Sequence, residues 1–153
     1  MLSKLILFLV LNFAALALGG LATGSGVTSE WYANLNKAPW TPPGWVFGFA
    51  WTSIMICFSF YMALLWPKVE NETMFLLILY SLQWLLNVSW NPVFFSWHQT
   101  KFALLLIIAL TLLIAYFLYT YWPALKLKSL LLLPYFLWLL IATSLNAFIV
   151  IKN

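Results

Sequence analysis

The spacing of charged residues is the feature of this sequence that most constrains its fold. The 153 residues include only seven Lys or Arg and three Asp or Glu. Between them lie neutral runs at 5–29, 38–67, 73–100, 102–125 and 129–151. A helix needs about 20 mostly apolar residues to cross a bilayer, so each run is long enough for one crossing. The sequence therefore predicts an all-α integral membrane protein.

Composition excludes several other classes of protein. Apolar residues make up 65% of the chain, whereas soluble domains have about 45–50%. The net charge of +4 is spread thinly and forms no basic patch that could follow a phosphate backbone, so we expect no nucleic-acid partner. A single cysteine and a single histidine exclude an intramolecular disulfide and a Cys/His zinc site, and we expect no metal site.

Turn signals trim these runs to a bundle of five transmembrane helices. Pro67 and Pro123 are expected to end the second and fourth helices, and Pro92 to kink or end the third. The links are too short for a second domain, so residues 1–153 are expected to form one membrane domain. The helices are predicted at about 3–22, 44–66, 73–95, 101–122 and 129–150, with one long loop at 23–43.

The first segment has two interpretations. Lys4, the apolar run Leu5–Ala14 and the small residues at 15–17 also fit a signal peptide with its cleavage site. The neutral run continues through Leu21, which favours a retained membrane helix.

The lysines bear on orientation and location. We call the membrane side that holds the N-terminus side A and the opposite side B. Four lysines against three favour side A as the cytoplasmic side. All seven basic residues are lysines, a bias typical of AT-rich genomes. We therefore expect the protein to be bacterial and to lie in the cell membrane. Side A carries Lys4, Lys68, Lys126 and Lys128; side B carries Lys37, Lys101 and Lys152.

Polar and aromatic residues converge within the side B half of the predicted bundle. Counting about 1.5 Å per helical residue puts them roughly 8–18 Å from side B. Amides that faced lipid would be unsatisfied, so these faces should point into the bundle. They are Trp51 on the second helix; Gln83, Asn87, Trp90 and Asn91 on one face of the third; and Trp138, Ala142 and Leu145 or Asn146 on the fifth.

Two interpretations of this convergence stay open. Buried amides often join neighbouring helices and bind nothing. Three indoles and several amides at matching depths instead favour a cavity for a large, mostly apolar ligand. The 23–43 loop lies over the same side, with Pro42 and Pro43 stiffening its end, and we expect it to act as a lid.

Three stretches of the chain resemble the tryptophan-rich sensory protein/translocator protein family (TspO/MBR, the peripheral-type benzodiazepine receptors). In order, they are Trp31-Tyr32-x-x-Leu35-x-Lys37-x-Pro39-Trp40-x-Pro42-Pro43-x-Trp45-x-Phe47 with Trp51; Gln83-x-x-x-Asn87-x-x-Trp90-x-Pro92-x-Phe94-Phe95 with His98; and Leu133-Pro134-Tyr135-x-x-Trp138-x-x-x-Ala142-Thr143-x-Leu145-Asn146. Phe148 stands in the stretch where the family's cholesterol motif has tyrosine, which argues against cholesterol as a ligand.

The resemblance implies a pocket under the first loop, usually in a homodimer within membrane lipid. It implies a receptor or sensor for porphyrins such as protoporphyrin IX, and for flat drugs of the isoquinoline or benzodiazepine type. No cofactor is expected besides the porphyrin as ligand or substrate. The expected ligand-binding residues are Trp31, Tyr32, Pro42, Trp51, Gln83, Asn87, Trp90, Trp138, Ala142, Leu145 and Asn146.

Two other functions remain as alternatives. The resemblance also implies light-dependent oxidative degradation of protoporphyrin IX, with Trp51 and Trp138 as the catalytic residues. A tetrapyrrole or sterol transporter is disfavoured, because no charged residue lies within a predicted span. His98 is expected to be a structural or interfacial group, and Glu30, Glu70 and Glu72 to be solvated loop residues.

Overall fold

The computed structural model describes residues 1–153, apart from the side chain of Glu70. Its described residues form helices and turns without any strand, which confirms the all-α expectation. Glu30 and Glu72 are exposed as expected, whereas the expectation for Glu70 lies outside the described side chains. The long helices are α1 (Leu2–Val27), α3 (Gly44–Leu65), α4 (Thr73–Phe95), α5 (Thr100–Leu125) and α6 (Leu133–Lys152); the short elements are α2 (Glu30–Asn34) and the 3-10 turns η1 (Trp66–Lys68), η2 (Glu70–Glu72) and η3 (Lys126–Leu132).

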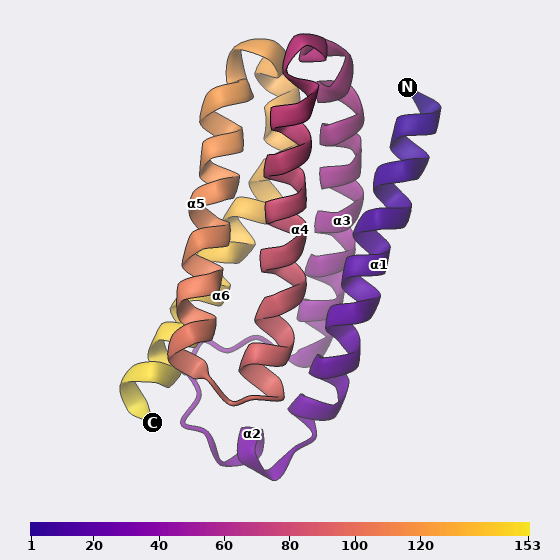
Figure 1. The fold of residues 1–153 in the computed structure, drawn as a ribbon. Helices are drawn as coiled ribbons and strands as arrows, with labels where there is room; N and C mark the ends of the chain where they lie inside the picture. The colour runs from indigo at the N-terminus through magenta and orange to yellow at the C-terminus, as the bar shows by residue number, and fades with distance from the viewer.

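The long helices are those of a membrane bundle. Helices α1, α3 and α4 are each long and apolar enough for one crossing, and Thr100–Lys152 is one apolar helical stretch of 53 residues. Figure 1 shows that this stretch reverses direction at η3, so α5 and α6 run antiparallel. Large apolar side chains such as Leu105, Leu112 and Tyr119 are exposed on the outer surface, where lipid would cover them.

The helices pack around a closed ring. Helix α1 packs on α3 and α4, α4 packs on α5, α5 packs on α6, and α6 returns to α3. The N-terminus lies at the same end as the η turns, whereas α2 and the C-terminus lie at the opposite end (Figure 1). This arrangement puts the lysines at the two ends that the sequence predicted as sides A and B.

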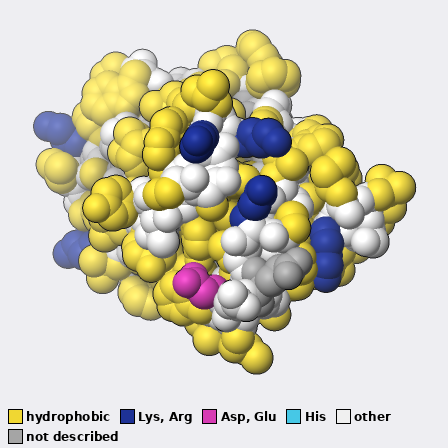
Figure 2. All heavy atoms as spheres, turned by 90° about the horizontal axis from the view of Figure 1, so that it is seen from above, with side chains coloured by type: hydrophobic (Ala, Val, Ile, Leu, Met, Phe, Trp, Pro, Cys, Tyr) yellow, Lys and Arg dark blue, Asp and Glu magenta, His cyan; other side chains and the backbone are white. Residues whose placement is uncertain are grey.

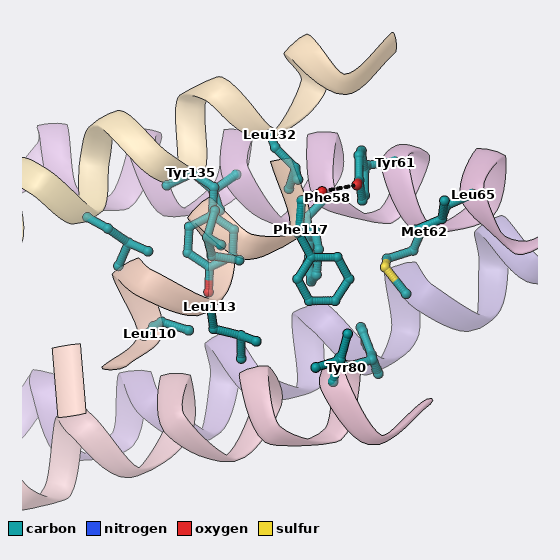
Figure 3. Packing of buried hydrophobic residues seen from close by; sticks show 14 of the residues in the cluster. Phe58, Tyr61, Met62, Leu65, Tyr80, Leu110, Leu113, Phe117, Leu132 and Tyr135 are labelled. Atoms are coloured by element: carbon teal, nitrogen blue, oxygen red, sulfur yellow. Dashed lines mark hydrogen bonds between the residues drawn. The ribbon is translucent and has the colours of Figure 1, made fainter. Parts of the chain in front are cut away.

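The packed core fills the side A half of the bundle. Figure 3 shows the rings of Phe58, Tyr61, Phe117 and Tyr135 converging from α3, α5 and α6. The Phe58 ring centroid lies 5.6 Å from that of Tyr135 and 6.2 Å from that of Phe117, both close to perpendicular. Edge-to-face contacts at such distances are favourable beyond simple burial. The Tyr61 hydroxyl donates to the Phe117 carbonyl oxygen at 3.2 Å.

A buried polar network ties α1 to its two neighbours. Asn12 Nδ2 donates to Ser59 Oγ at 2.9 Å, and the Tyr80 hydroxyl donates to Asn12 Oδ1 at 2.8 Å. Trp84 Nε1 donates to the Leu11 carbonyl oxygen at 2.9 Å. Polar groups left unpaired in a bilayer are costly, so each bond favours the arrangement in which the helices touch. The sequence alone did not predict a structural role for Asn12 or Tyr80.

Helix α1 is longer than predicted. It continues to Val27 rather than ending near residue 22, so Gly24 and Gly26 are helical rather than flexible loop residues. Close packing explains why a glycine occupies position 26 of this helix, because a Cβ atom there would lie 2.4 Å from Phe95 of α4. The loop that joins α1 to α3 therefore covers residues 28–43, contains α2, and is called the first loop below.

The second half of the chain also differs from its predicted boundaries. Helix α5 continues past Pro123 to Leu125, because a proline in the last turn removes only one helical hydrogen bond there. Lys126 then takes a φ of 50°, and the chain reverses through η3. Helix α6 consequently begins at Leu133 instead of residue 129, with Pro134 in its first turn, where proline is best tolerated.

The close approach at Gly26 can be tested by stability. Gly26→Ala should lower the free energy of unfolding in detergent micelles by about 1–3 kcal/mol, because Phe95 must move. Gly24→Ala is the matched control, since nothing lies within 4 Å of its added Cβ. That control should be neutral or slightly stabilising, as alanine favours a helix over glycine. Equal effects of the two substitutions in thermal unfolding would contradict this packing role.

Candidate functional site

A cavity of about 540 Å³ occupies the side B half of the bundle. Its walls come from α1, α3, α4 and α6, with Ile107 of α5, and the first loop covers it. The volume is within the range of about 300–1,000 Å³ that is typical of small-molecule sites. It lies where the sequence predicted a pocket, below the loop and beside the packed core.

Aromatic rings form much of the cavity wall. Trp51 on α3, Trp90 on α4 and Trp138 on α6 all line it. Phe47 meets Trp138 edge to face, with the ring centroids 5.2 Å apart at 84°. Trp51 meets Tyr135 of the core at 6.0 Å and 75°. These contacts hold the indoles in fixed orientations, so the cavity offers flat, polarisable surfaces to a ligand.

Two buried residues that line the cavity carry a polar group without a hydrogen-bond partner among the described residues. Asn87 is only 7% exposed and lines the cavity, yet its side chain makes no hydrogen bond to any residue that the structure describes. The Nε1 atom of Trp138 is buried and likewise has no partner among the described residues. Buried donors and acceptors are nearly always paired. The Asn87 amide is therefore available to a ligand in the cavity, whereas the Trp138 Nε1 atom has almost no accessible surface and could pair only if the indole moved.

The neighbouring amide, Asn91, belongs to the packing between helices. Its Oδ1 accepts a hydrogen bond from Thr23 Oγ1 at 2.6 Å, and its Nδ2 donates to the Asn87 carbonyl oxygen at 3.2 Å. A Cβ atom at Gly19 would lie 2.6 Å from that Nδ2 atom. Asn91 thus fixes α1 against α4 at the cavity wall and leaves Asn87 as the unpaired amide.

The first loop roofs the cavity and is anchored on both sides. Ser29 caps α2 by accepting a hydrogen bond from the Tyr32 backbone N–H at 3.2 Å. On the far side, Trp40 Nε1 donates to Ser144 Oγ at 3.1 Å, and the Asn36 backbone N–H donates to Asn153 Oδ1 at 2.9 Å. These bonds attach the loop to α6, so it is an ordered cover.

Two residues of this loop carry the polar chemistry of the roof. Burial raises the pKa of the Tyr32 phenol, which therefore stays neutral and able to donate a hydrogen bond. Lys37 Nζ lies 4.6 Å from the centre of the Tyr32 ring and donates to the Ala33 carbonyl oxygen at 3.3 Å. Among the described lining residues, Lys37 alone bears a charge. The cavity therefore combines an apolar interior with one cation under its roof.

Most residues predicted for the site line this cavity. The structure places there Tyr32, Pro42, Trp51, Asn87, Trp90, Trp138 and Ala142. It places Trp31 elsewhere: the indole stacks on His98, with ring centroids 4.0 Å apart, and meets Phe94 at 5.6 Å. Trp31 therefore fastens α2 to the turn between α4 and α5 and does not line the pocket.

Gln83, Leu145 and Asn146 also lie outside the cavity lining. Gln83 Nε2 donates to the Tyr135 hydroxyl at 2.7 Å, one turn deeper than Asn87. Asn146 accepts from Trp90 Nε1 at 3.1 Å and donates to the Thr100 carbonyl oxygen at 3.0 Å. Leu145 is buried beside it in α6. The amides of Gln83 and Asn146 therefore join helices. The sequence left open whether the polar residues join helices or line a ligand cavity; Gln83 and Asn146 join helices, whereas Asn87 lines the cavity.

Sequence reasoning missed the contribution of α1 and of Lys37. Ala15, Gly19, Gly20 and Thr23 form one wall of the cavity. Their small size was the available signal, because small residues let a helix come close to its neighbours or leave space beside them. Lys37 was assigned to side B and named in the family resemblance but not predicted as a site residue, and nothing in its spacing placed it beneath the loop.

This architecture is that of a multi-pass α-helical membrane protein with a covered internal cavity. The chain belongs to the TspO/MBR family, whose model matches residues 7–151. The family resemblance inferred from the Trp, Pro and Asn spacings is thereby confirmed.

Relatives from different organisms match most of the chain. It is 35% identical to the tryptophan-rich sensory protein of Cereibacter sphaeroides, over 90% of this chain and 87% of that protein. It is 34% identical to the tryptophan-rich protein TspO of Archaeoglobus fulgidus, over 97% and 98% of the two chains. Its identity to the human translocator protein is 32%, over 76% of this chain and 71% of that one.

The different roles of Asn87 and Gln83 can be separated in the protein without ligand. Asn87→Leu should leave the free energy of unfolding unchanged or raise it, because that side chain has no partner to lose. Gln83→Leu should lower it by about 1–3 kcal/mol, since the buried Tyr135 hydroxyl loses its partner. Thermal and denaturant unfolding in micelles measures both. Equal destabilisation by the two substitutions would make Asn87 a structural amide.

Proposed function

We propose that this protein is a receptor or sensor in a bacterial cell membrane that binds porphyrins, protoporphyrin IX above all, in the side B cavity. Related flat apolar ligands, such as isoquinoline or benzodiazepine drugs, would occupy the same space. The proposal is supported by the family membership and by a cavity of about 540 Å³ with three indoles in its wall. Aromatic faces with a few polar groups are typical of sites for such ligands.

The observation that carries the proposal is the unpaired polar edge of the cavity. Asn87 and the Nε1 of Trp138 lie on α4 and α6, and neither has a hydrogen-bond partner among the described residues. An accessible amide such as that of Asn87, left unpaired in the wall of a cavity, would cost stability for no gain if the cavity bound nothing. A flat apolar ligand that presents a hydrogen-bonding nitrogen or oxygen to the cavity wall would pair with the Asn87 amide, which can both donate and accept.

The chemistry of the roof fits the acidic edge of a tetrapyrrole. Protoporphyrin IX is a flat apolar ring with two propionate groups on one edge. Lys37 supplies the positive charge at the roof of the cavity, next to the neutral Tyr32 phenol. We infer that the ring lies between the indoles while a propionate reaches Lys37 near water, where a charge is less costly.

The contribution of Asn87 to binding is directly measurable. Asn87→Leu should weaken binding of protoporphyrin IX by about 1–2 kcal/mol if one buried hydrogen bond is lost. The measurement is a titration followed by saturable quenching of tryptophan fluorescence. Asn71→Leu, an exposed change in the loop at side A, is the control and should bind as the wild type does. Unchanged affinity in Asn87→Leu would remove the main support for the site.

The role of Lys37 is tested with a modified ligand. Lys37→Gln should weaken binding of protoporphyrin IX about two- to fivefold, as expected for loss of a partly exposed ion pair. Its dimethyl ester, which lacks the carboxylates, should bind the variant and the wild type equally. Lys101→Gln, with the same charge change on side B, should affect neither ligand. Equal weakening for acid and ester would show that Lys37 does not pair with a carboxylate.

One observation favours a second function, light-dependent breakdown of the porphyrin. Trp51 and Trp138 line the same cavity, so both indoles would contact a bound ring and could give an electron to its photoexcited state. Phenylalanine keeps a flat ring but lacks the indole N–H and is harder to oxidise.

This second function separates from binding in single variants. Trp51→Phe and Trp138→Phe should keep most of the porphyrin affinity and lose the protein-dependent decay of the porphyrin absorption band under illumination. The control is porphyrin in the same detergent without protein, measured in light and in dark. If the wild-type protein bleaches porphyrin no faster than this control, the protein only binds it.

A further inference from the structure

A second cavity lies at the opposite end of the bundle, on side A. Its volume is about 600 Å³. Four lysines from three separate parts of the chain surround it, together with Trp66 and Pro67 of the α3–α4 turn. Figure 2 looks onto this end of the molecule and shows lysine side chains grouped among hydrophobic surface. The lysines are Lys4, Lys68, Lys126 and Lys128.

The fold brings these lysines together through its turns. Lys4 lies in the first turns of α1, Lys68 ends η1, and Lys126 and Lys128 lie in η3. Lys126 has a φ of 50°, a conformation that is unfavourable for a residue with a side chain. Such strained residues persist where the surrounding structure fixes them, and they concentrate at functional positions. Here the strained residue starts the reversal that points two lysines at the cavity.

The described residues that line this cavity do not balance its positive charge. The described residues that line it include four ammonium groups and no carboxylate. Lys4 Nζ lies 3.9 Å from the centre of the Trp66 ring, a cation–π contact that holds the charge in place without neutralising it. No described carboxylate forms a salt bridge with any of the four lysines. Like charges around one cavity repel, so an anion placed among them would be stabilised.

The surroundings of the cavity indicate an anion that also carries an apolar part. Leu2 and Leu127 flank the lining lysines and are 69% and 75% exposed. Trp66 lines the cavity, and Trp122 is exposed at the same end of the bundle. Tryptophans are enriched where the membrane meets water, so this end lies at the membrane surface. A lipid phosphate could reach the lysines while its acyl chains run along the helices, whereas a free phosphate would leave these apolar side chains uncovered.

We propose that this cavity binds the phosphate headgroup of an anionic phospholipid from the surrounding bilayer. The lysines act together as a basic pocket at the membrane surface, and the exposed leucines contact the acyl chains. Basic pockets at the ends of transmembrane helices recognise anionic headgroups in this way. The site is separate from the side B cavity and does not depend on what that cavity binds.

The test uses the whole protein and two double variants with equal charge. Lys68→Gln/Lys128→Gln removes two lysines from the cavity, whereas Lys101→Gln/Lys152→Gln removes two exposed lysines from side B. Each protein is delipidated in detergent and titrated with phosphatidylglycerol or phosphatidylcholine, and bound lipid is counted by native mass spectrometry. Thermal unfolding of all three proteins confirms that they are folded.

The wild type and the side B variant should retain phosphatidylglycerol in preference to phosphatidylcholine. The side A variant should bind phosphatidylglycerol about tenfold more weakly, as two charge contacts are lost. Equal binding of the two lipids by the wild type, or equal loss in both variants, would overturn the proposal. Displacement of the bound lipid by millimolar inorganic phosphate would also overturn it, because the site would then take a free anion.

Discussion

Hydrogen bonds between helices are the interactions on which the rest of this structure depends. In a bilayer the lipid is as apolar as the helix surfaces, so burial of apolar area alone does not bring helices together. Helix α4 contributes several of the hydrogen bonds that do so. Tyr80 and Trp84 bond to α1, Gln83 bonds to Tyr135 of α6, and Trp90 bonds to Asn146 of α6. These bonds hold α4 to α1, its neighbour in the ring, and to α6, so the ring of helices closes.

The closed ring is filled differently in its two halves. In the interior of the side A half, large rings such as Phe58, Phe117 and Tyr135 meet and fill the space between the helices, below the lysine-lined cavity at the end of the bundle. In the side B half, small residues face the centre from α1 and α3, among them Gly19, Gly20 and Gly48. Side-chain volume therefore decides where the cavity lies. The first loop then covers it, because its anchors to α6 hold it over the opening.

The features that the sequence predicted well are those set by periodicity and composition. Charge spacing located every long helix, and the shared face of Asn87 and Trp90 located the cavity wall. Helix ends were predicted less well, since they depend on neighbours: α1 continues to Val27 because Gly26 packs on Phe95. Only tertiary contacts could show that Gln83 binds Tyr135 while Asn87 stays unpaired.

The position of loop residues was the least predictable part of the site. Trp31 and Tyr32 are adjacent in sequence, yet Tyr32 faces the cavity and Trp31 stacks on His98. Both lie in helix α2, which is only five residues long, and their side chains point in different directions from it. The position of α2 depends on the Ser29 cap and on contacts with α4. The position of α2 also sets the path of the loop that follows it, and this path brings Lys37 to the cavity.

We propose that a tetrapyrrole binds in the side B half, beneath the first loop. Hydrogen–deuterium exchange of the wild-type protein in micelles, with and without protoporphyrin IX in the dark, tests it most directly. With porphyrin bound we expect slower exchange at residues 28–43 and at the side B ends of α3 and α6, because the loop opens less often when the cavity is filled. Exchange at the η1, η2 and η3 turns should not change. Protection confined to these side A turns, with the first loop unaffected, would contradict the account.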